Sequence, residues 1–215
     1  MRVFTIVVAA LLCTAGLLAG GPAFAQQGTA STQGAASTQP PTITSVLDTQ
    51  LTIIEREFTG AAQAMPEDKY SFAPTNGEFK GVRTFAQEVK HVATVNNRFF
   101  GSILGETAPV APDEGIGSNG PDAIQTKEQI LQYLHESFAH AHKAIATINA
   151  DNAATPMANP AVPFLRTRAA LAIFACTHAM DHYGQMVEYL RDNGIVPPAS
   201  AQRPPANPPA KPSGD

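Results

Sequence analysis

The chain has 215 residues, enough for one domain of ordinary size or two small ones, and 44% hydrophobic residues are sufficient for a core. Its formal net charge of -4 gives no basic field of the kind that nucleic-acid-binding proteins carry. The two cysteines, Cys13 and Cys176, cannot form a disulfide framework if Cys13 is removed with a leader peptide.

The first 25 residues have the pattern of a secretory signal peptide. Arg2 supplies the positive charge, residues 3–19 are almost wholly apolar, and Ala23-Phe24-Ala25 is a small-residue cleavage site before Gln26. A retained membrane anchor is the alternative, but an apolar run of about 17 residues is at the short limit for spanning a bilayer. We therefore predict that residues 1–25 are removed and that the mature protein is periplasmic or secreted.

Two segments of biased composition flank the part of the chain that can fold. Residues 26–41 consist mainly of Ala, Ser, Thr, Gln and Gly without periodicity, and residues 199–215 are rich in proline. Neither segment can bury a core, so we predict a disordered linker and an extended, disordered tail. The folded domain is expected to span residues 42–198.

The first two helices are predicted from apolar residues that recur every three or four positions. The first should begin after Thr44 or Ser45 as its N-cap and end at Pro66. The second should end near Gly105, and its polar stripe member Asn96 is interpreted as a hydrogen-bonded core group. A loop over about 106–121 then crosses the end of the bundle or borders a site. The two stripes are Leu47, Leu51, Ile54, Phe58, Ala61 and Met65, and Phe85, Val89, Val92, Asn96, Phe99 and Ile103.

Two further helices have similar patterns. The third is indicated by the capping-box spacing of Thr126 and Gln129; the fourth should begin near Pro163 and end at Asn193-Gly194. No long stretch alternates with the period of a strand, so no sheet is expected. The fold predicted from four such helices is all-α, an antiparallel four-helix bundle. Their stripes are Ile130, Leu134, Phe138, Ala141, Ile145 and Ile148, and Leu165, Ala169, Ala172, Cys176, Ala179, Tyr183, Val187 and Leu190.

Three of the six histidines are candidates for a metal site. His178 and His182 are four residues apart and share one helix face, a spacing that lets two imidazoles reach one ion. His91 lies in the second predicted helix, and each of the three stands one residue before a stripe position. This shared offset suits a metal site at the edge of the bundle, open to a cleft. Three unrelated, half-exposed histidines would show the same pattern.

Two segments resemble the DinB-like superfamily: Phe85-Ala-Gln-Glu-Val-Lys-His91-Val-Ala-Thr-Val-Asn96, and His178-x-x-x-His182-x-Gly184-Gln185 followed by Leu190-Arg191-x-x-Gly194-Ile195-x-Pro197-Pro198. The resemblance covers about residues 42–198. It implies a four-helix bundle in which His91, His178 and His182 bind a divalent metal. Tyr183 departs from the pattern, because an arginine often stands there; this affects contacts around the ligands. Some relatives are thiol-dependent transferases or isomerases and many have no assigned activity, so the resemblance implies fold and metal better than reaction.

The three other histidines and the second cysteine also require an interpretation. His140 also precedes a stripe residue, so the pattern does not exclude it as a ligand. His135 and His142 lie on the other side of that stripe and are expected to be solvated. Cys176 lies on the core stripe and is interpreted as a buried, inert thiol.

Polar residues near the triad allow two further interpretations. Glu88 and His91 form one Glu-x-x-His motif, but a di-iron bundle needs two and position 175 is Ala175, so one metal is expected rather than two. Asp181 and Gln185 share the face of His178 and are candidates to orient the ligands.

Three imidazoles leave at least one coordination position for another ligand. Zn²⁺ is the first choice for nitrogen ligands, and Ni, Fe or Mn would also fit. The first hypothesis is an exported metal-dependent transferase or hydrolase that acts on a small-molecule substrate or a thiol. The second is a non-enzymatic metal- or ligand-binding bundle, and a third is a structural bundle without metal. We expect no nucleic-acid partner and no membrane span after cleavage, and a homodimer is compatible with the sequence.

Overall fold

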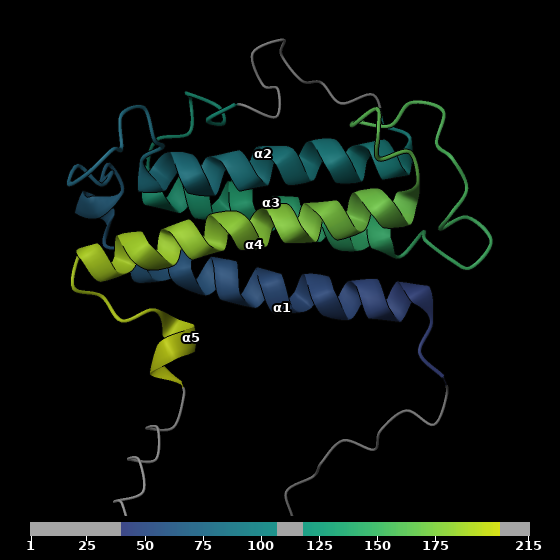
Figure 1. Cartoon of the computed structure of the whole chain (residues 1–215), viewed down its shortest axis with the longest axis horizontal. Coiled ribbons are helices and arrows are strands. Elements are labelled where there is room, and N and C mark those ends of the chain that lie inside the picture. Colours follow the sequence, from purple (N-terminus) through teal and green to yellow (C-terminus); the bar gives the residue numbers. More distant parts are fainter. Residues whose placement is uncertain (1–39, 107–117, 203–215) are drawn as a thin grey trace, which may run out of the picture. The chain divides into compact units, whose positions relative to one another are not determined.

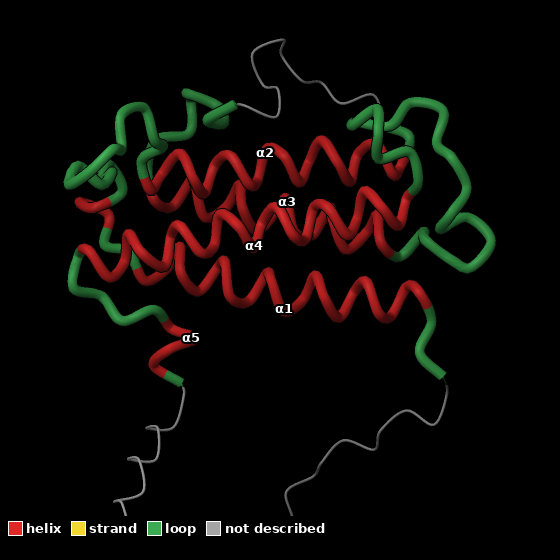
Figure 2. The backbone as a smooth tube through the Cα atoms, in the orientation of Figure 1, coloured by secondary structure: helices red, strands yellow, loops and turns green. Residues whose placement is uncertain are grey.

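The computed structural model describes residues 40–106 and 118–202, all within the second of two units into which the chain divides, Gln39–Asp215. The predicted signal peptide and residues 26–39 of the predicted linker lie outside the described residues. The described part is helical (Figure 1, Figure 2), and its single β pairing is an isolated bridge between Pro156 and Thr167. The prediction of an all-helical bundle is therefore confirmed. The elements are α1 (Ile43–Ala64), the 3-10 helix η1 (Glu67–Lys69), α2 (Phe85–Leu104), α3 (Lys127–Ile145), α4 (Arg168–Asp192) and α5 (Pro198–Ala201).

The starts of the helices are fixed by threonine caps. The predicted capping box of α3 is present, because the Thr126 side chain accepts from the backbone of Gln129 and the Gln129 side chain accepts in return. α1 begins earlier than predicted, since Thr42 is its N-cap and Ser45 is the residue that completes the box. Thr44, one of the two predicted caps, instead donates its hydroxyl to the carbonyl of Ile148 after α3.

α4 begins five residues later than predicted. Pro163 was expected in its first turn, but the N-cap is Thr167 and the helix starts at Arg168. Before the helix, the backbone N–H of Met157 donates to the carbonyl of Arg166 at 2.7 Å, and residues 162–165 form a turn in which the N–H of Leu165 donates to the carbonyl of Val162 at 2.9 Å. Because this pairing occupies the residues before Thr167, Pro163 lies in the connection and not in the helix.

The core lies between the four long helices and is built largely from the predicted stripes. Every stripe residue predicted for the first three helices is buried. In the second half of α4 the predicted stripe is wrong at Tyr183 and Val187, which are half-buried while Met186 and Tyr189 are buried; Leu190 is buried as predicted. The cause is His182, which itself faces inward, although the apolar pattern of α4 places it beside the stripe.

Asn96 is buried among the apolar residues of α2, as its stripe position predicted. Its Nδ2 has no hydrogen-bond partner among the described residues, so the expectation of a hydrogen-bonded amide is wrong for this nitrogen. An unpaired buried amide costs about 1–3 kcal/mol relative to a paired one.

The four long helices form a ring in which α2 lies beside α3 and α4, and α1 lies beside the same two helices. α2 and α3 run in the same direction, because Thr94 meets Tyr133 and, further along both helices, Asn97 meets His140. α1 and α4 run the opposite way (Figure 1). Two helices thus run in each direction, and the long connection after α2 returns the chain to the end of the bundle where α2 began.

One short element was not predicted. α5 follows α4 after a tight turn and packs on α1, where Pro198 lies beside Gly60. Residues 199–202 of the predicted disordered tail therefore lie in or directly after a helical turn, and the rest of that tail lies outside the described residues. Among the described helices, none has both the length and the apolar character needed to cross a membrane.

Candidate metal centre

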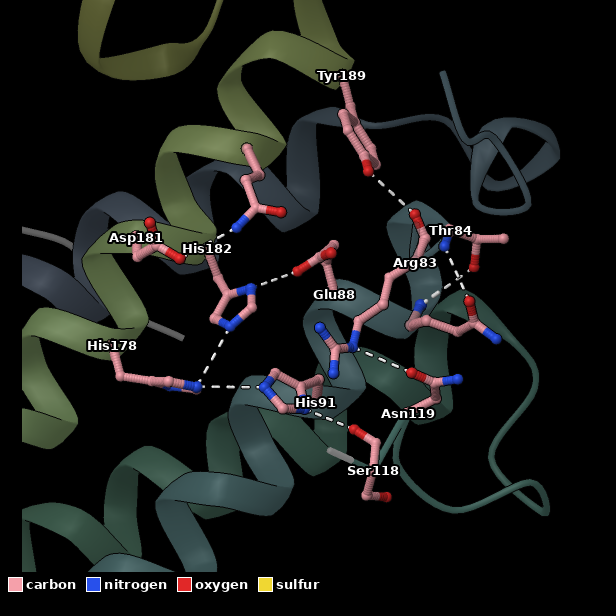
Figure 3. Close-up of polar contacts among 12 residues, drawn as sticks. Arg83, Thr84, Glu88, His91, Ser118, Asn119, His178, Asp181, His182 and Tyr189 are labelled. Carbon is pink, nitrogen blue, oxygen red and sulfur yellow. Dashed lines mark hydrogen bonds and ion pairs between the residues drawn. The ribbon is translucent and has the colours of Figure 1, made fainter. Parts of the chain in front are cut away.

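Two neighbouring, antiparallel helices bring the three predicted histidines together. α2 contributes His91, and α4 contributes His178 and His182 from successive turns (Figure 3). The Nε2 atom of His178 lies 3.2 Å from Nε2 of His91 and 3.2 Å from Nε2 of His182. One nitrogen of each ring lies within 4.8 Å of the others, so the three imidazoles could hold a metal ion.

His91 is oriented by the connection that precedes α3. Its Nδ1 lies 2.5 Å from the backbone carbonyl oxygen of Ser118. A carbonyl oxygen only accepts, so the proton of the neutral ring is on Nδ1 and the lone pair of Nε2 faces the other two histidines. The long loop therefore borders the site at Ser118, which is one of the two placements that its length suggested.

His182 is oriented by a buried carboxylate. Its Nδ1 lies 2.5 Å from Oε2 of Glu88, and both side chains are almost fully buried, at 8% and 2% exposure. The carboxylate accepts the Nδ1 proton and leaves the Nε2 lone pair directed at His178. A carboxylate behind an imidazole is the usual outer partner of a metal-ligating histidine, and it raises the basicity of the ligating nitrogen.

The surroundings of His178 indicate that the imidazole nitrogens of the three histidines fit a cation. Its Nε2 faces two lone pairs, but a single proton there can be donated to only one of them. Its Nδ1 is buried and has no hydrogen-bond partner among the described residues. A divalent ion at the centre would be stabilised by all three lone pairs at once, and three imidazole nitrogens suit Zn²⁺ and also Ni, Fe or Mn.

Burial keeps two of the three histidines neutral. It lowers the pKa of His91 to about 4, an effect that the hydrogen bond to Ser118 opposes and the charge of Arg83 reinforces. Burial also lowers the pKa of His178 to about 3, and the neighbouring histidines and Arg83 lower it further. Both rings are therefore neutral at neutral pH and keep one nitrogen lone pair each, which metal binding requires, and in His91 that lone pair is on Nε2.

The expectation of a site at the edge of the bundle is corrected. His91 and His182 are 2% and 6% exposed, and only His178 is half-buried. The difference arises because residues 118–124 cover α2 on the side that a bare four-helix bundle would leave open. Any access to the triad among the described residues is thus on the side of His178.

A close backbone approach holds this covering segment in place. Lys90 is buried and its Nζ donates to the carbonyls of Pro121, at 2.9 Å, and Ile124, at 3.2 Å. Gly120 has φ of +79°, and a Cβ there would stand 2.4 Å from Cβ of Lys90. Only glycine allows the segment to lie this close to α2 and to present the Ser118 carbonyl to His91.

The other histidines lie outside the triad. His140 bonds Glu106 at 2.8 Å and Asn97 at 3.3 Å, so its ring is already held by two side chains. His135 is exposed, as predicted. The expectation that His142 is solvated is wrong, because its ring bridges α3 to Asp48 and Glu55 of α1 at 2.6 and 3.0 Å.

The remaining candidates have structural contacts. Gln185 donates to Asp181 at 3.1 Å, and no hydrogen bond links either residue to a ligand among the described contacts. Tyr183, the departure from the family pattern, donates to Glu57 of α1 at 3.2 Å. Cys176 is buried and burial raises the pKa of its thiol to about 11, in agreement with an inert core cysteine.

Sequence reasoning missed the two groups that orient the ligands, Glu88 and Ser118. The spacing of Glu88 and His91 suggests half of a di-metal motif, whereas the partner of Glu88 is His182 on the other helix. The signal was present, because a glutamate three residues before a ligand lies on the same helix face. Ser118 acts through its backbone carbonyl, for which side-chain identity gives no signal.

Comparison with known proteins agrees with this geometry. No curated protein matches the chain. The family model described as the DinB superfamily matches residues 50–186, which is more than half of the chain and includes all three histidines. The chain therefore belongs to the DinB superfamily.

Proposed function

We propose that this protein is an exported, metal-dependent transferase or hydrolase that binds one divalent ion through His91, His178 and His182. The observation that carries the proposal is the convergence of three Nε2 atoms, two of them in rings whose Nδ1 atoms are already hydrogen-bonded to acceptors. Without a cation, this arrangement would direct lone pairs at one another in a buried place, which is unfavourable.

The protein contributes a preformed and largely buried site for the ion. Glu88 and the Ser118 carbonyl fix two imidazoles in the ligating tautomer, and burial keeps His91 and His178 neutral. The chemistry that such an ion supplies when bound is Lewis acidity, which activates a water or thiol nucleophile or polarises a substrate oxygen. Zn²⁺ is the first choice for three imidazoles, with Ni, Fe or Mn as alternatives.

Export is supported by the apolar segment 3–19 and the Ala23-Phe24-Ala25 sequence. A periplasmic or extracellular location weighs against cytosolic thiol cofactors as substrates. It favours a small-molecule substrate over the thiol-transfer chemistry of some family members. The intact mass of the exported protein tests the cleavage after Ala25, and a leader retained in the membrane fraction contradicts it.

A second candidate is a non-enzymatic metal- or ligand-binding bundle. It is favoured by the role of Glu88, whose buried carboxylate is engaged by His182 and so cannot also serve as a free base. Ester-hydrolysis and thiol-transfer screens of the metal-loaded and metal-stripped protein separate the two candidates. Turnover that depends on the metal supports the enzyme, and binding without turnover supports the second candidate.

Metal content per chain tests the site itself. We expect one ion per wild-type chain, and Ala substitution of His91, His178 or His182 should weaken binding by orders of magnitude because two imidazoles rarely hold an ion alone. His135→Ala is the matched control, since His135 is exposed on α3 and should not affect occupancy. Helicity is measured for each variant. Full occupancy of His91→Ala at limiting metal would remove His91 from the site.

A further inference from the structure

We propose that the groove between α1 and α4 is a binding site for an uncharged aliphatic molecule that carries one polar group. His178 and His182 extend from α4 toward α2, whereas this groove lies on the side of α4 that faces α1. The proposal therefore goes beyond the metal centre and does not depend on it. It is carried by the shape of the groove, by its exposed apolar side chains and by the position of the charged residues around it.

The groove has a buried apolar floor and exposed apolar walls. It encloses about 410 Å³, which is within the range of roughly 300–1,000 Å³ that small-molecule sites occupy. Leu47, Ile54 and Cys176 line it and are buried. Val46 on α1 and Ile173 on α4 also line it and are each 53% exposed. A ligand that covers these two side chains removes apolar surface from water, which favours binding.

The exposed walls arise from a second apolar stripe on each helix. Val46 and Ile53 are seven residues apart on α1, and Ile173 and Met180 are seven apart on α4, so each pair shares one helix face. All four are exposed, although both helices bury another face in the core. Because α1 and α4 run side by side in the same direction (Figure 1), the two stripes flank a single seam.

The charged residues of α1 lie away from the groove or at its end. Asp48 and Glu55 both bond His142, which places them on the side of α1 that faces α3. Glu57 accepts a hydrogen bond from Tyr183 of α4 at 3.2 Å and marks the end of the neutral strip. The described residues that line the groove include no charged and no aromatic side chain. An ion placed there would lose hydration without gaining a partner, so the groove suits an uncharged aliphatic ligand.

Two polar side chains on the walls match one polar group of such a ligand. The hydroxyl of Thr177 donates to the carbonyl of Phe174 at 3.0 Å, which leaves its oxygen as an acceptor. Gln50 lines the groove from α1, and its side-chain amide offers both a donor and an acceptor. An alcohol, which both donates and accepts, therefore fits this set.

The size of the neutral strip favours a small molecule over a second copy of the chain. The α1 residues that line the groove run from Ile43 to Ile54. At 1.5 Å per residue this is a length of about 17 Å, and the spacing of packed helices gives a width of about 8–10 Å. The resulting area, on the order of 200 Å², is well below the roughly 800 Å² that each partner buries in a stable dimer.

Calorimetric titration of the mature chain with 1-decanol and with decanoate at neutral pH tests the proposal. The two probes have carbon chains of equal length and differ in the charge of the head group. We expect 1-decanol to bind about 10- to 100-fold more tightly, because the groove offers the carboxylate no cation. Val46→Asp places a carboxylate on the wall and should weaken decanol binding about 10-fold or more. Val196→Asp is the matched control, since Val196 is exposed beyond the end of α4, and should leave decanol binding unchanged.

Equal binding of the two probes by the wild type overturns the proposal, as does a decanol affinity that Val46→Asp leaves unchanged. Circular dichroism checks that Val46→Asp folds, and Ile173→Asn on the facing helix replaces it if it does not. Metal content is measured in the same samples and should be equal in the wild type and Val46→Asp, so the groove and the metal site are tested separately.

Sedimentation and vesicle flotation test the two other occupants of an apolar face. A wild type that is monomeric and stays apart from phosphatidylcholine vesicles supports the proposal. A dimer that Val46→Asp dissociates means that a second copy covers the groove, and vesicle binding that Val46→Asp abolishes means that a bilayer covers it. Either result overturns the assignment of a small-molecule site.

Discussion

Glu88 is the residue whose charge should matter most to the metal without touching it. Its carboxylate accepts the Nδ1 proton of His182 in a buried pair. Glu88→Gln keeps the size of the side chain but removes the charge, so Nε2 of His182 becomes a weaker donor to a metal. We expect metal affinity to fall about 10- to 100-fold.

Competition with a chelator of known affinity measures this change. Glu136→Gln is the control, because Glu136 is exposed on α3 and bonds only Gln132 among the described contacts. Unchanged affinity in Glu88→Gln would mean that the carboxylate only fills space behind the ring.

The stabilisation that His142 contributes to the fold should decrease as the pH rises. Burial lowers its pKa, but the hydrogen bonds and charges of Asp48 and Glu55 outweigh burial and raise the pKa above the ordinary value. A raised folded-state pKa means that the folded protein binds the proton more tightly than the unfolded chain does. The stabilisation is therefore fully present below about pH 6.5 and is lost as pH rises through the folded pKa.

Denaturant unfolding of the wild type and His142→Ala at pH 5.5 and pH 9 checks this sign. Because the cluster is partly exposed, we expect a difference of about 1 kcal/mol at pH 5.5 and a smaller one at pH 9. His135→Ala on the same helix should show no pH-dependent difference. A difference that grows toward pH 9 would contradict the raised pKa.

The grouping of the three histidines could be predicted from the sequence, but the groups that orient them could not. The spacing of His178 and His182 within one helix identifies them as candidates, and the family pattern identifies His91. The pairing of Glu88 with His182 joins residues 94 positions apart and depends on the register of α2 against α4. No local pattern encodes that register, so the correct partner of Glu88 emerges only from the packed helices.

Among the elements, the segment that covers α2 depends on Gly120. A methyl group at this position would meet Lys90, and the positive φ adds backbone strain. We expect Gly120→Ala to lower the free energy of unfolding by about 1–3 kcal/mol and to weaken metal binding, because the Ser118 carbonyl moves away from His91.

Gly81→Ala separates the effect of the positive φ from the effect of the close approach to Lys90. Gly81 has a similar φ of +81°, but no described atom lies within 4 Å of the position where its Cβ would be. Its substitution should cost about 1 kcal/mol for the left-handed backbone and leave metal affinity unchanged. An equal loss of metal affinity in both variants would show that the close approach at Gly120 is not what positions Ser118.

The helices themselves were predictable where apolar residues alone form the buried face. This holds for α1, α2 and α3, whose stripes lie in the core. It fails in α4, where His182 occupies a core position and shifts the true stripe to Met186 and Tyr189. The prediction also fails at Pro163, because the helical pattern does not reveal the backbone pairing that delays the start of α4.

At the scale of the whole molecule, the metal should stabilise the fold without being needed for it. The four long helices share an extensive core of apolar side chains whose packing needs no metal, so the metal-free protein should remain helical. An ion that binds only the folded state adds about 2.7 kcal/mol when its free concentration is 100 times the Kd. For a domain of this size that corresponds to a rise in Tm of roughly 5–10 °C.

Thermal unfolding with and without Zn²⁺, followed by circular dichroism, measures this rise, and His91→Ala should not show it. Loss of helicity on chelation would contradict a core that folds by itself.

The direction in which the helices run has a consequence for how the protein folds. α1 and α2 lie at opposite corners of the ring, as do α3 and α4, while α2 and α3 are parallel. No two consecutive long helices can therefore form a hairpin, and the contacts that stabilise the bundle join distant parts of the chain. His91 and His178 are separated by 87 residues. Such non-local contacts slow folding relative to an up-and-down bundle of equal length, and the triad can assemble only after α4, the last long helix of the described chain, has docked.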